Sequence, residues 1–180
     1  MTALPAEPPA APTMPTLAGV HPLGIAEPAA DKLGRSVPHY DGLDFLRAIQ
    51  SGELPPPPVA ELLGFEIVEL AKGEVTFAMT PREEHYNAIG SVHGGVVATL
   101  LDTVMGCALH TLLPKQSWYT TLDINVRYHR GVTLQTGRVL ATGTVTHNGR
   151  RTATAEARLV DAATRRLMAT STSSLLVVRP

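Results

Sequence analysis

One long apolar segment with helical spacing, set among segments with the alternation of β-strands, constrains this chain more than any other feature. At about 100° per residue, the segment 92–112 places an apolar stripe along one side of a helix. The stripe consists of Val97, Leu101, Val104, Ala108 and Leu112. The other side is small and polar and consists of Gly95, Ala98, Thr99, Asp102, Thr103 and Gly106. The pattern predicts a helix that is buried along one side and can be approached closely on the other.

Strand patterns precede and follow this helix. The stretches "FEIVEL" and "EVTFAMT" alternate and are joined by the short connection "AKG". After Pro114, further strands are predicted at 118–129, 133–147, 150–162 and 165–178, with "HNGR" as a hairpin turn. One helix with five or six antiparallel strands is an α+β arrangement. We therefore predict a curved antiparallel sheet wrapped around one long central helix.

The N-terminal third divides into two parts. Residues 1–40 form a Pro- and Ala-rich tail, which we expect to be extended and weakly ordered, or to act as an arm that wraps a partner subunit. The tail has no Lys or Arg before Lys32 and is interrupted by prolines, so it does not fit a secretory signal. Residues 41–58 are predicted to form a short helix and a proline linker, and 59–180 the main domain.

Composition and charge exclude several functions. A formal net charge of -1 gives no long-range attraction to nucleic acid or to an anionic membrane. Asp102, in the middle of the apolar segment, would be costly in a bilayer. The single cysteine, Cys107, fits a buried, inert thiol in the reducing cytoplasm. The seven histidines show no metal-ligand spacing, and no nucleotide-binding glycine motif is present. We therefore predict no metal and no cofactor.

The most specific motif begins at Asn87. After five intervening residues it continues with His93-Gly94-Gly95, and Asp102 follows eight residues after the first glycine. Together with "TTLDINVRYHRGV" and "HNGRRTATAEARLVDAATRRLMA", this motif resembles the PaaI-type acyl-CoA thioesterases of the hotdog fold. The resemblance runs from about residue 62 to residue 178.

The resemblance implies a role for each matching residue. The backbone N–H of Gly94 and the side chain of Asn87 would bind the thioester carbonyl oxygen. Asp102 would activate water or attack the carbonyl itself, and Thr121 would orient that water or carboxylate. His93 would lie close to the thioester, with capping of the helix as the alternative reading.

The substrate-binding residues are predicted less directly. Gly95 would let the substrate approach the backbone. Arg130, Arg150 and Arg151 fall at a strand end and a hairpin, where they would hold CoA phosphates or remain solvated edge charges. The acyl group is expected to be aryl-acetyl or medium-chain, with Tyr86, Met105 and Trp118 as candidate lining.

The chemistry of these residues agrees with thioester hydrolysis. Negative charge builds on the carbonyl oxygen during attack, and a helix N-terminus offers unsatisfied N–H groups and a positive dipole. A hotdog hydratase or dehydratase acting on acyl thioesters remains an alternative, as does a non-catalytic acyl-CoA binding module. The acid at position 102 argues against the binding module, which has no need of it.

Helix geometry predicts a homodimer with shared active sites. Gly94 and Asp102 are about 12 Å apart along one helix at 1.5 Å per residue, which is too far for both to reach one carbonyl. Two antiparallel copies of the helix, related by a twofold axis near Ala98, would bring Gly94 of one chain opposite Asp102 of the other. A homotetramer, as a dimer of dimers, is the alternative assembly.

Overall fold

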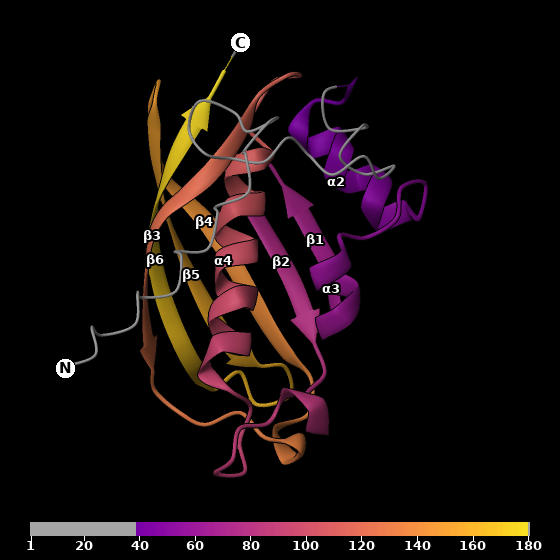
Figure 1. Ribbon diagram of the computed structural model, residues 1–180, viewed down its shortest axis with the longest axis vertical. Helices are drawn as coiled ribbons and strands as arrows, with labels where there is room; N and C mark the ends of the chain where they lie inside the picture. The colour runs from indigo at the N-terminus through magenta and orange to yellow at the C-terminus, as the bar shows by residue number, and fades with distance from the viewer. Residues whose placement is uncertain (1–38, 180) are drawn as a thin grey trace, which may run out of the picture.

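A computed structural model describes residues 39–179 of the chain. Six strands form one antiparallel sheet in the order β1-β2-β4-β5-β6-β3 (Figure 1). The strands are β1 (Phe65–Ala71), β2 (Glu74–Met79), β3 (Trp118–Tyr128), β4 (Val139–Asn148), β5 (Thr152–Asp161) and β6 (Leu167–Val178). The predicted tail lies outside the described residues, except for His39 and Tyr40.

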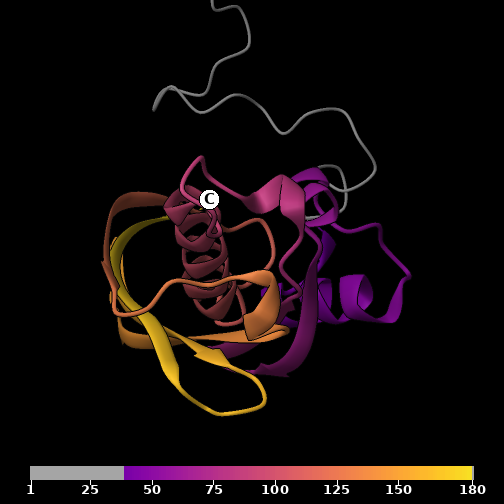
Figure 2. The same cartoon turned by 90° about the horizontal axis from the view of Figure 1, so that it is seen from below.

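The long helix α4 (Gly94–His110) lies in the concave side of this sheet, which curves around it (Figure 2). Four of the five residues of the predicted stripe are buried in the core, and Leu112, just beyond the helix, is half-buried. The helix backbone rests directly on β4 at Gly143, where a Cβ atom would lie 2.4 Å from the Val104 carbonyl oxygen. The predicted α+β fold, with a curved antiparallel sheet around one central helix, is confirmed.

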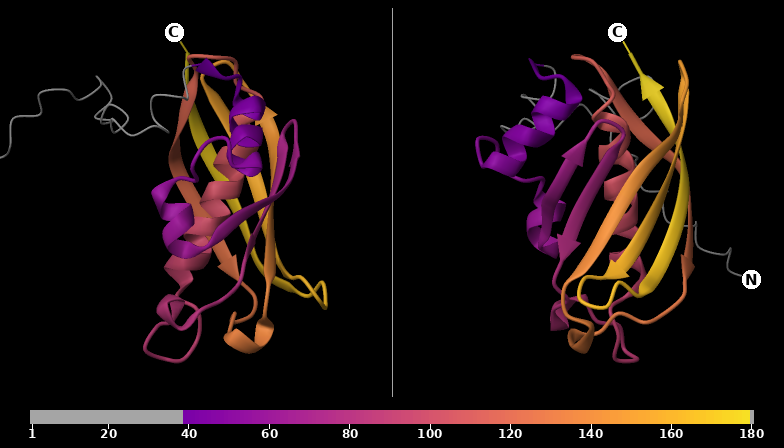
Figure 3. Two further views of the ribbon diagram at one scale, coloured as in Figure 1. Left: turned by 90° about the vertical axis from the view of Figure 1, so that its right-hand side faces the viewer. Right: turned by 180° about the vertical axis from the view of Figure 1, so that it is seen from behind.

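Two short helices cover the β1 edge of the sheet (Figure 3). Helix α2 (Gly42–Ser51) packs Phe45 and Leu46 into the hydrophobic core, and its Gln50 side chain donates hydrogen bonds to the carbonyl oxygens of two β1 residues. Helix α3 (Pro58–Leu63) was not predicted from the sequence. The proline run was read as an extended linker, although a proline at the first helical position and a left-handed Gly64 after the last are common helix boundaries.

Strand β3 forms the opposite edge and contains a bulge between Thr121 and Asp123. Side chains alternate along a strand, so Thr121 and Tyr128, which are seven positions apart, should face opposite sides of the sheet. The extra residue of a bulge reverses this alternation. As a result Thr121 and Tyr128 both reach α4, where each makes a hydrogen bond.

The prediction that the fourth strand begins near residue 133 is wrong. A single turn of 3-10 helix, η3 (Leu134–Thr136), occupies the beginning of that segment, and the strand begins at Val139. The side chains of Thr133 and Thr136 stabilise the turn, and Gly137 ends it with a φ of 68°. A second such turn, η2 (Glu83–His85), precedes α4.

Candidate active site

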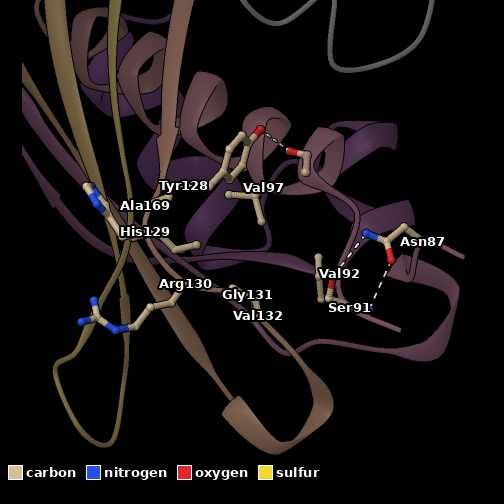
Figure 4. Close-up of a pocket in the computed structure, with 12 residues that line it drawn as sticks. Asn87, Ser91, Val92, Val97, Tyr128, His129, Arg130, Gly131, Val132 and Ala169 are labelled. Atoms are coloured by element: carbon tan, nitrogen blue, oxygen red, sulfur yellow. Dashed lines mark hydrogen bonds between the residues drawn. The ribbon is translucent and has the colours of Figure 1, made fainter. Parts of the chain in front are cut away.

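A pocket of about 310 Å³ opens at the N-terminus of α4 (Figure 4). Its lining comes from the loop before α4, the first turn of that helix, the end of β3 and the segment after it, with Leu159 of β5 and Ala169 of β6. Asn87, Gly94 and Arg130, three of the residues singled out in the sequence, lie in this pocket. Tyr128 also lines it, and its hydroxyl donates a 2.8 Å hydrogen bond to the Gly94 carbonyl oxygen. Tyr128 was not identified from the sequence, because the bulge that turns it toward α4 leaves no pattern.

The first backbone N–H groups of α4 are not equivalent. His93 is the N-cap, and its Nδ1 atom accepts a 2.8 Å hydrogen bond from the Gly95 N–H. The N–H groups of Val96 and Val97 bond to the His93 carbonyl oxygen. Within residues 39–179, no hydrogen-bond acceptor pairs with the N–H of Gly94. Of the two glycines, Gly94 therefore has the N–H that remains able to donate to a ligand.

Asn87 shapes the loop that leads into the helix. Its Oδ1 accepts hydrogen bonds from the N–H groups of Ile89 (3.0 Å) and Ser91 (3.3 Å). Its Nδ2 donates to the Ser91 hydroxyl at 3.2 Å. An amide nitrogen carries two hydrogens, so one donor of Asn87 is left beside the pocket. The loop contacts fix the position of that donor.

Asp102 lies apart from this pocket, two turns further along α4. It is half-buried, and its Oδ1 accepts a 2.9 Å hydrogen bond from the Thr121 hydroxyl. The predicted pairing of these two residues is present in the structure, while their catalytic roles remain a prediction. Asp102 does not line the pocket at Gly94, from which it is separated by about 12 Å of helix. One chain therefore carries two separated parts of the candidate site.

The three arginines that were predicted to hold CoA phosphates also lie in two separate places. Arg130 lines the Gly94 pocket, and its guanidinium donates a 2.8 Å hydrogen bond to the Leu167 carbonyl oxygen. Arg150 and Arg151 lie at the β4–β5 turn, at the other end of the sheet, beside the end of β6. The length of β4, about 3.3 Å per residue, separates them from the pocket by roughly 30 Å. Of these three arginines, Arg130 is the one close to Gly94 of its own chain.

The polar side of α4 is partly covered by its own chain. A Cβ atom on Gly106 would lie 2.3 Å from the Tyr119 hydroxyl, so this ring is what approaches the helix closely there. Burial, together with the nearby Asp102 carboxylate, raises the pKa of the Cys107 thiol to about 12. Cys107 is therefore a thiol rather than a thiolate near neutral pH, as the sequence suggested.

Two further properties of the described residues bear on function. Within residues 39–179, no group of three or more His, Cys, Asp and Glu side chains is placed to hold a metal ion. In the same part of the chain, no helix is long and apolar enough to span a membrane.

Comparisons with known proteins agree with this geometry. A sequence model of the thioesterase superfamily matches residues 89–168. The structure resembles that of a variant of the phenylacetic acid degradation protein PaaI from Thermus thermophilus, with 30% sequence identity and a TM-score of 0.60. This similarity covers 67% of the present chain and 98% of the Thermus chain. The chain belongs to the PaaI-type thioesterase family with the hotdog fold.

Two further proteins are similar to this PaaI-type chain, one in structure and one in sequence. Escherichia coli PaaI shares the fold at a TM-score of 0.66, with 20% identity over 80% of this chain and 97% of its own. Human acyl-coenzyme A thioesterase 13 is 39% identical over 62 residues, which make up 34% of this chain and 44% of the human protein. The chain thus spans about half the length, or slightly less, of the curated relatives that it matches.

Proposed function

We propose that this protein hydrolyses acyl-CoA thioesters to a free acid and CoA. The observation that carries the proposal is the position of Asp102, which is half-buried on α4 and held by the Thr121 hydroxyl of the edge strand β3. The unpaired N–H of Gly94 complements it as a donor for the oxygen that becomes negative during attack. Family membership supports the same reaction.

The donors and the carboxylate have different tasks in the proposed reaction. The Gly94 N–H and the remaining Asn87 donor stabilise the negative charge on the carbonyl oxygen. Asp102 removes a proton from an attacking water molecule, or attacks the carbonyl carbon itself. In either case a bond from oxygen to the carbonyl carbon forms, the carbon–sulfur bond breaks, and the CoA thiolate takes up a proton. When water attacks, it supplies the second oxygen atom of the acid directly. When Asp102 attacks, a water molecule then hydrolyses the acyl–Asp102 anhydride, which releases the acid and regenerates the carboxylate.

In this proposal, each active site forms between two copies of the chain, with the Gly94 donor from one copy and the Asp102 carboxylate from the other. The edge of β1 is covered by α2, whereas β3 is an unpaired edge within residues 39–179. Leu122 and Ile124 on β3 are exposed by 55% and 38%, which favours contact with another chain. A twofold dimer would place Gly94 of one copy near Asp102 of the other. A dimer of dimers would retain these sites.

The direct test is release of free thiol from a panel of acyl-CoA esters, including phenylacetyl-CoA and octanoyl-CoA. Asp102→Asn keeps the size and shape of the side chain and removes the base. We expect kcat to fall by about 10²–10⁴-fold with the fold intact. Retention of more than half of the wild-type turnover would exclude Asp102 as the attacking group. A change in enoyl absorbance without thiol release would instead identify a hydratase.

A further inference from the structure

A second pocket, of about 240 Å³, lies between α4 and the two N-terminal helices. Leu46 and Ile49 of α2 and Val59 of α3 form one wall, and Thr103 and Cys107 of α4 form another. Strands β1 and β2, together with Pro56 and Pro57 before α3, contribute most of the remainder. Apart from α4, all of these elements precede residues 89–168, the segment matched by the superfamily model. Most of the pocket is therefore built by a part of the chain outside that segment.

The chemistry of this pocket fits an uncharged apolar group. Most of its lining is aliphatic, aromatic or proline. The three polar side chains of Gln50, Glu66 and Thr103 are already engaged. Thr103 donates a 2.7 Å hydrogen bond to the Thr99 carbonyl oxygen. Gln50 donates to the carbonyl oxygens of Ile67 and Val68, and Glu66 forms a 3.0 Å ion pair with Arg138. The ionised side chain in this lining, Glu66, is thus paired with Arg138, and burial of hydrocarbon against the apolar remainder is favourable.

The pocket borders Asp102 along α4, although Asp102 itself is not part of its lining. Thr103 directly follows Asp102, and Cys107 lies little more than one helical turn further on. The Asp102 carboxylate is close enough to Cys107 to contribute to the raised pKa of its thiol. Through Thr103, the pocket therefore begins one residue along α4, and about 100° around it, from the proposed attacking group.

We propose that this pocket binds the acyl group of the thioester that Asp102 attacks, and that Ile49 limits the size of that group. The inference rests on the proposed function and adds the specificity site to it. An engineered apolar cavity of about 150 Å³ holds benzene. By that scale, 240 Å³ accommodates one phenyl ring or an alkyl chain of about six to nine carbons. Met105, a candidate for this role in the sequence, is instead fully buried in the core.

The test compares two tryptophan substitutions. Ile49→Trp fills the pocket from α2, while Leu62→Trp places the same side chain on α3 at a residue that is 73% exposed and does not line the pocket. The readout is the ratio of kcat/KM for octanoyl-CoA to that for acetyl-CoA. We expect Ile49→Trp to lower this ratio at least tenfold, and Leu62→Trp to change it less than twofold. Equal ratios in both variants and the wild type would overturn the proposal.

A second variant tests the proposal even if Ile49→Trp fails to fold. Ile49→Ala enlarges the pocket without overpacking, so the preferred acyl chain should become longer; an unchanged preference would contradict the proposal. Phenylacetyl-CoA and octanoyl-CoA together distinguish a ring-binding from a chain-binding pocket.

Binding provides a readout that does not depend on turnover. In Asp102→Asn protein, each added methylene should tighten the Kd of the acyl-CoA about threefold to fourfold up to the depth of the pocket. Ile49→Trp in this background should abolish that gain, and a gain that persists would overturn the pocket assignment. Failure of the wild type to release thiol from any ester would instead refute the proposed function, so the two failures are distinguishable.

Discussion

The Thr121 hydroxyl donates a 2.9 Å hydrogen bond to Asp102 Oδ1, connecting the edge strand β3 to the middle of α4. This bond restricts the rotation of the carboxylate and leaves its other oxygen available. We infer that Thr121 is a positioning residue and that its effect on activity is exerted through Asp102.

Replacement of Thr121 by Val removes the hydroxyl and keeps a β-branched side chain suited to a strand. A hydrogen bond to a charged group contributes about 1.5–3 kcal/mol, so kcat should fall about 10- to 100-fold if the bond is fully used in the reaction. The matched control is Thr120→Val, one residue earlier on the same strand. Equal kcat values for the two variants would show that the Thr121 bond has no role in catalysis.

Asn87 has both a structural and a proposed chemical role, and two variants separate them. Asn87→Ala should lower kcat by about 10²-fold, because one donor to the carbonyl oxygen is lost while the Gly94 N–H remains. Ser91→Ala removes the 3.2 Å bond from Asn87 but keeps its amide, and should cost less than tenfold. If both variants lose the same activity, Asn87 acts through the loop alone.

His110 should make folding stability depend on pH. It packs under α2 against Phe45 and Tyr119, and its buried Nδ1 has no hydrogen-bond partner among residues 39–179. Burial lowers the pKa of His110 from 6.5 to about 4. Between these values the unfolded chain binds a proton that the folded protein excludes, so stability falls as pH decreases. The expected loss between pH 7 and pH 5 is about 2 kcal/mol.

Urea denaturation at both pH values measures this loss. The pKa of His85 is also lowered by burial, so part of the dependence will persist without His110. His110→Phe should therefore reduce the difference between pH 7 and pH 5 by about 2 kcal/mol without eliminating it. An unchanged difference in His110→Phe would contradict the assignment.

Gly42, the first residue of α2, should not tolerate a side chain. A Cβ atom there would lie 1.7 Å from the carbonyl oxygen of His110, a backbone atom that cannot move independently. Glycine to alanine normally stabilises a helix by up to about 1 kcal/mol, but overpacking here should destabilise the protein by about 1–3 kcal/mol. Asp44→Ala, on the exposed side of α2, should change stability by less than about 0.5 kcal/mol. Stabilisation by Gly42→Ala would show that α2 does not pack as described.

Local patterns were sufficient to predict most of the fold. The helix predicted at 92–112 spans Gly94–His110, and five of the six strands begin within two residues of the prediction. The exception is β4, where the Thr133–Thr136 side-chain contacts favour a turn over the strand that the local sequence suggests. Helix α3 was missed because prolines were interpreted only as helix breakers, although proline is favourable at a helix start.

The candidate site was less predictable, because its geometry depends on contacts between distant segments. The ordered motif identified Asn87, Gly94 and Asp102. The pairing of Asp102 with Thr121 was expected from resemblance to the family, whereas the contact of Tyr128 with Gly94 requires the β3 bulge. The second pocket depends on how α2 and α3 pack against α4, which no local periodicity encodes.

The central claim is that each active site combines Gly94 of one chain with Asp102 of another. Gly94→Pro removes the N–H at the first helical position, which tolerates proline, and the preceding His93 already has the extended backbone that a proline requires. Gly94→Ala is the matched control, since it adds a Cβ beside Tyr128 and keeps the N–H. The proline variant should be inactive, and the alanine variant should retain activity.

The most direct measurement is thiol release by Gly94→Pro and Asp102→Asn chains that have been unfolded and refolded together. Random pairing gives about half mixed dimers, each with one intact site of two, so the mixture should recover roughly a quarter of wild-type activity. Dimers of either variant alone should remain inactive. If mixed dimers are shown to form and the mixture stays as inactive as its parents, the shared site is contradicted.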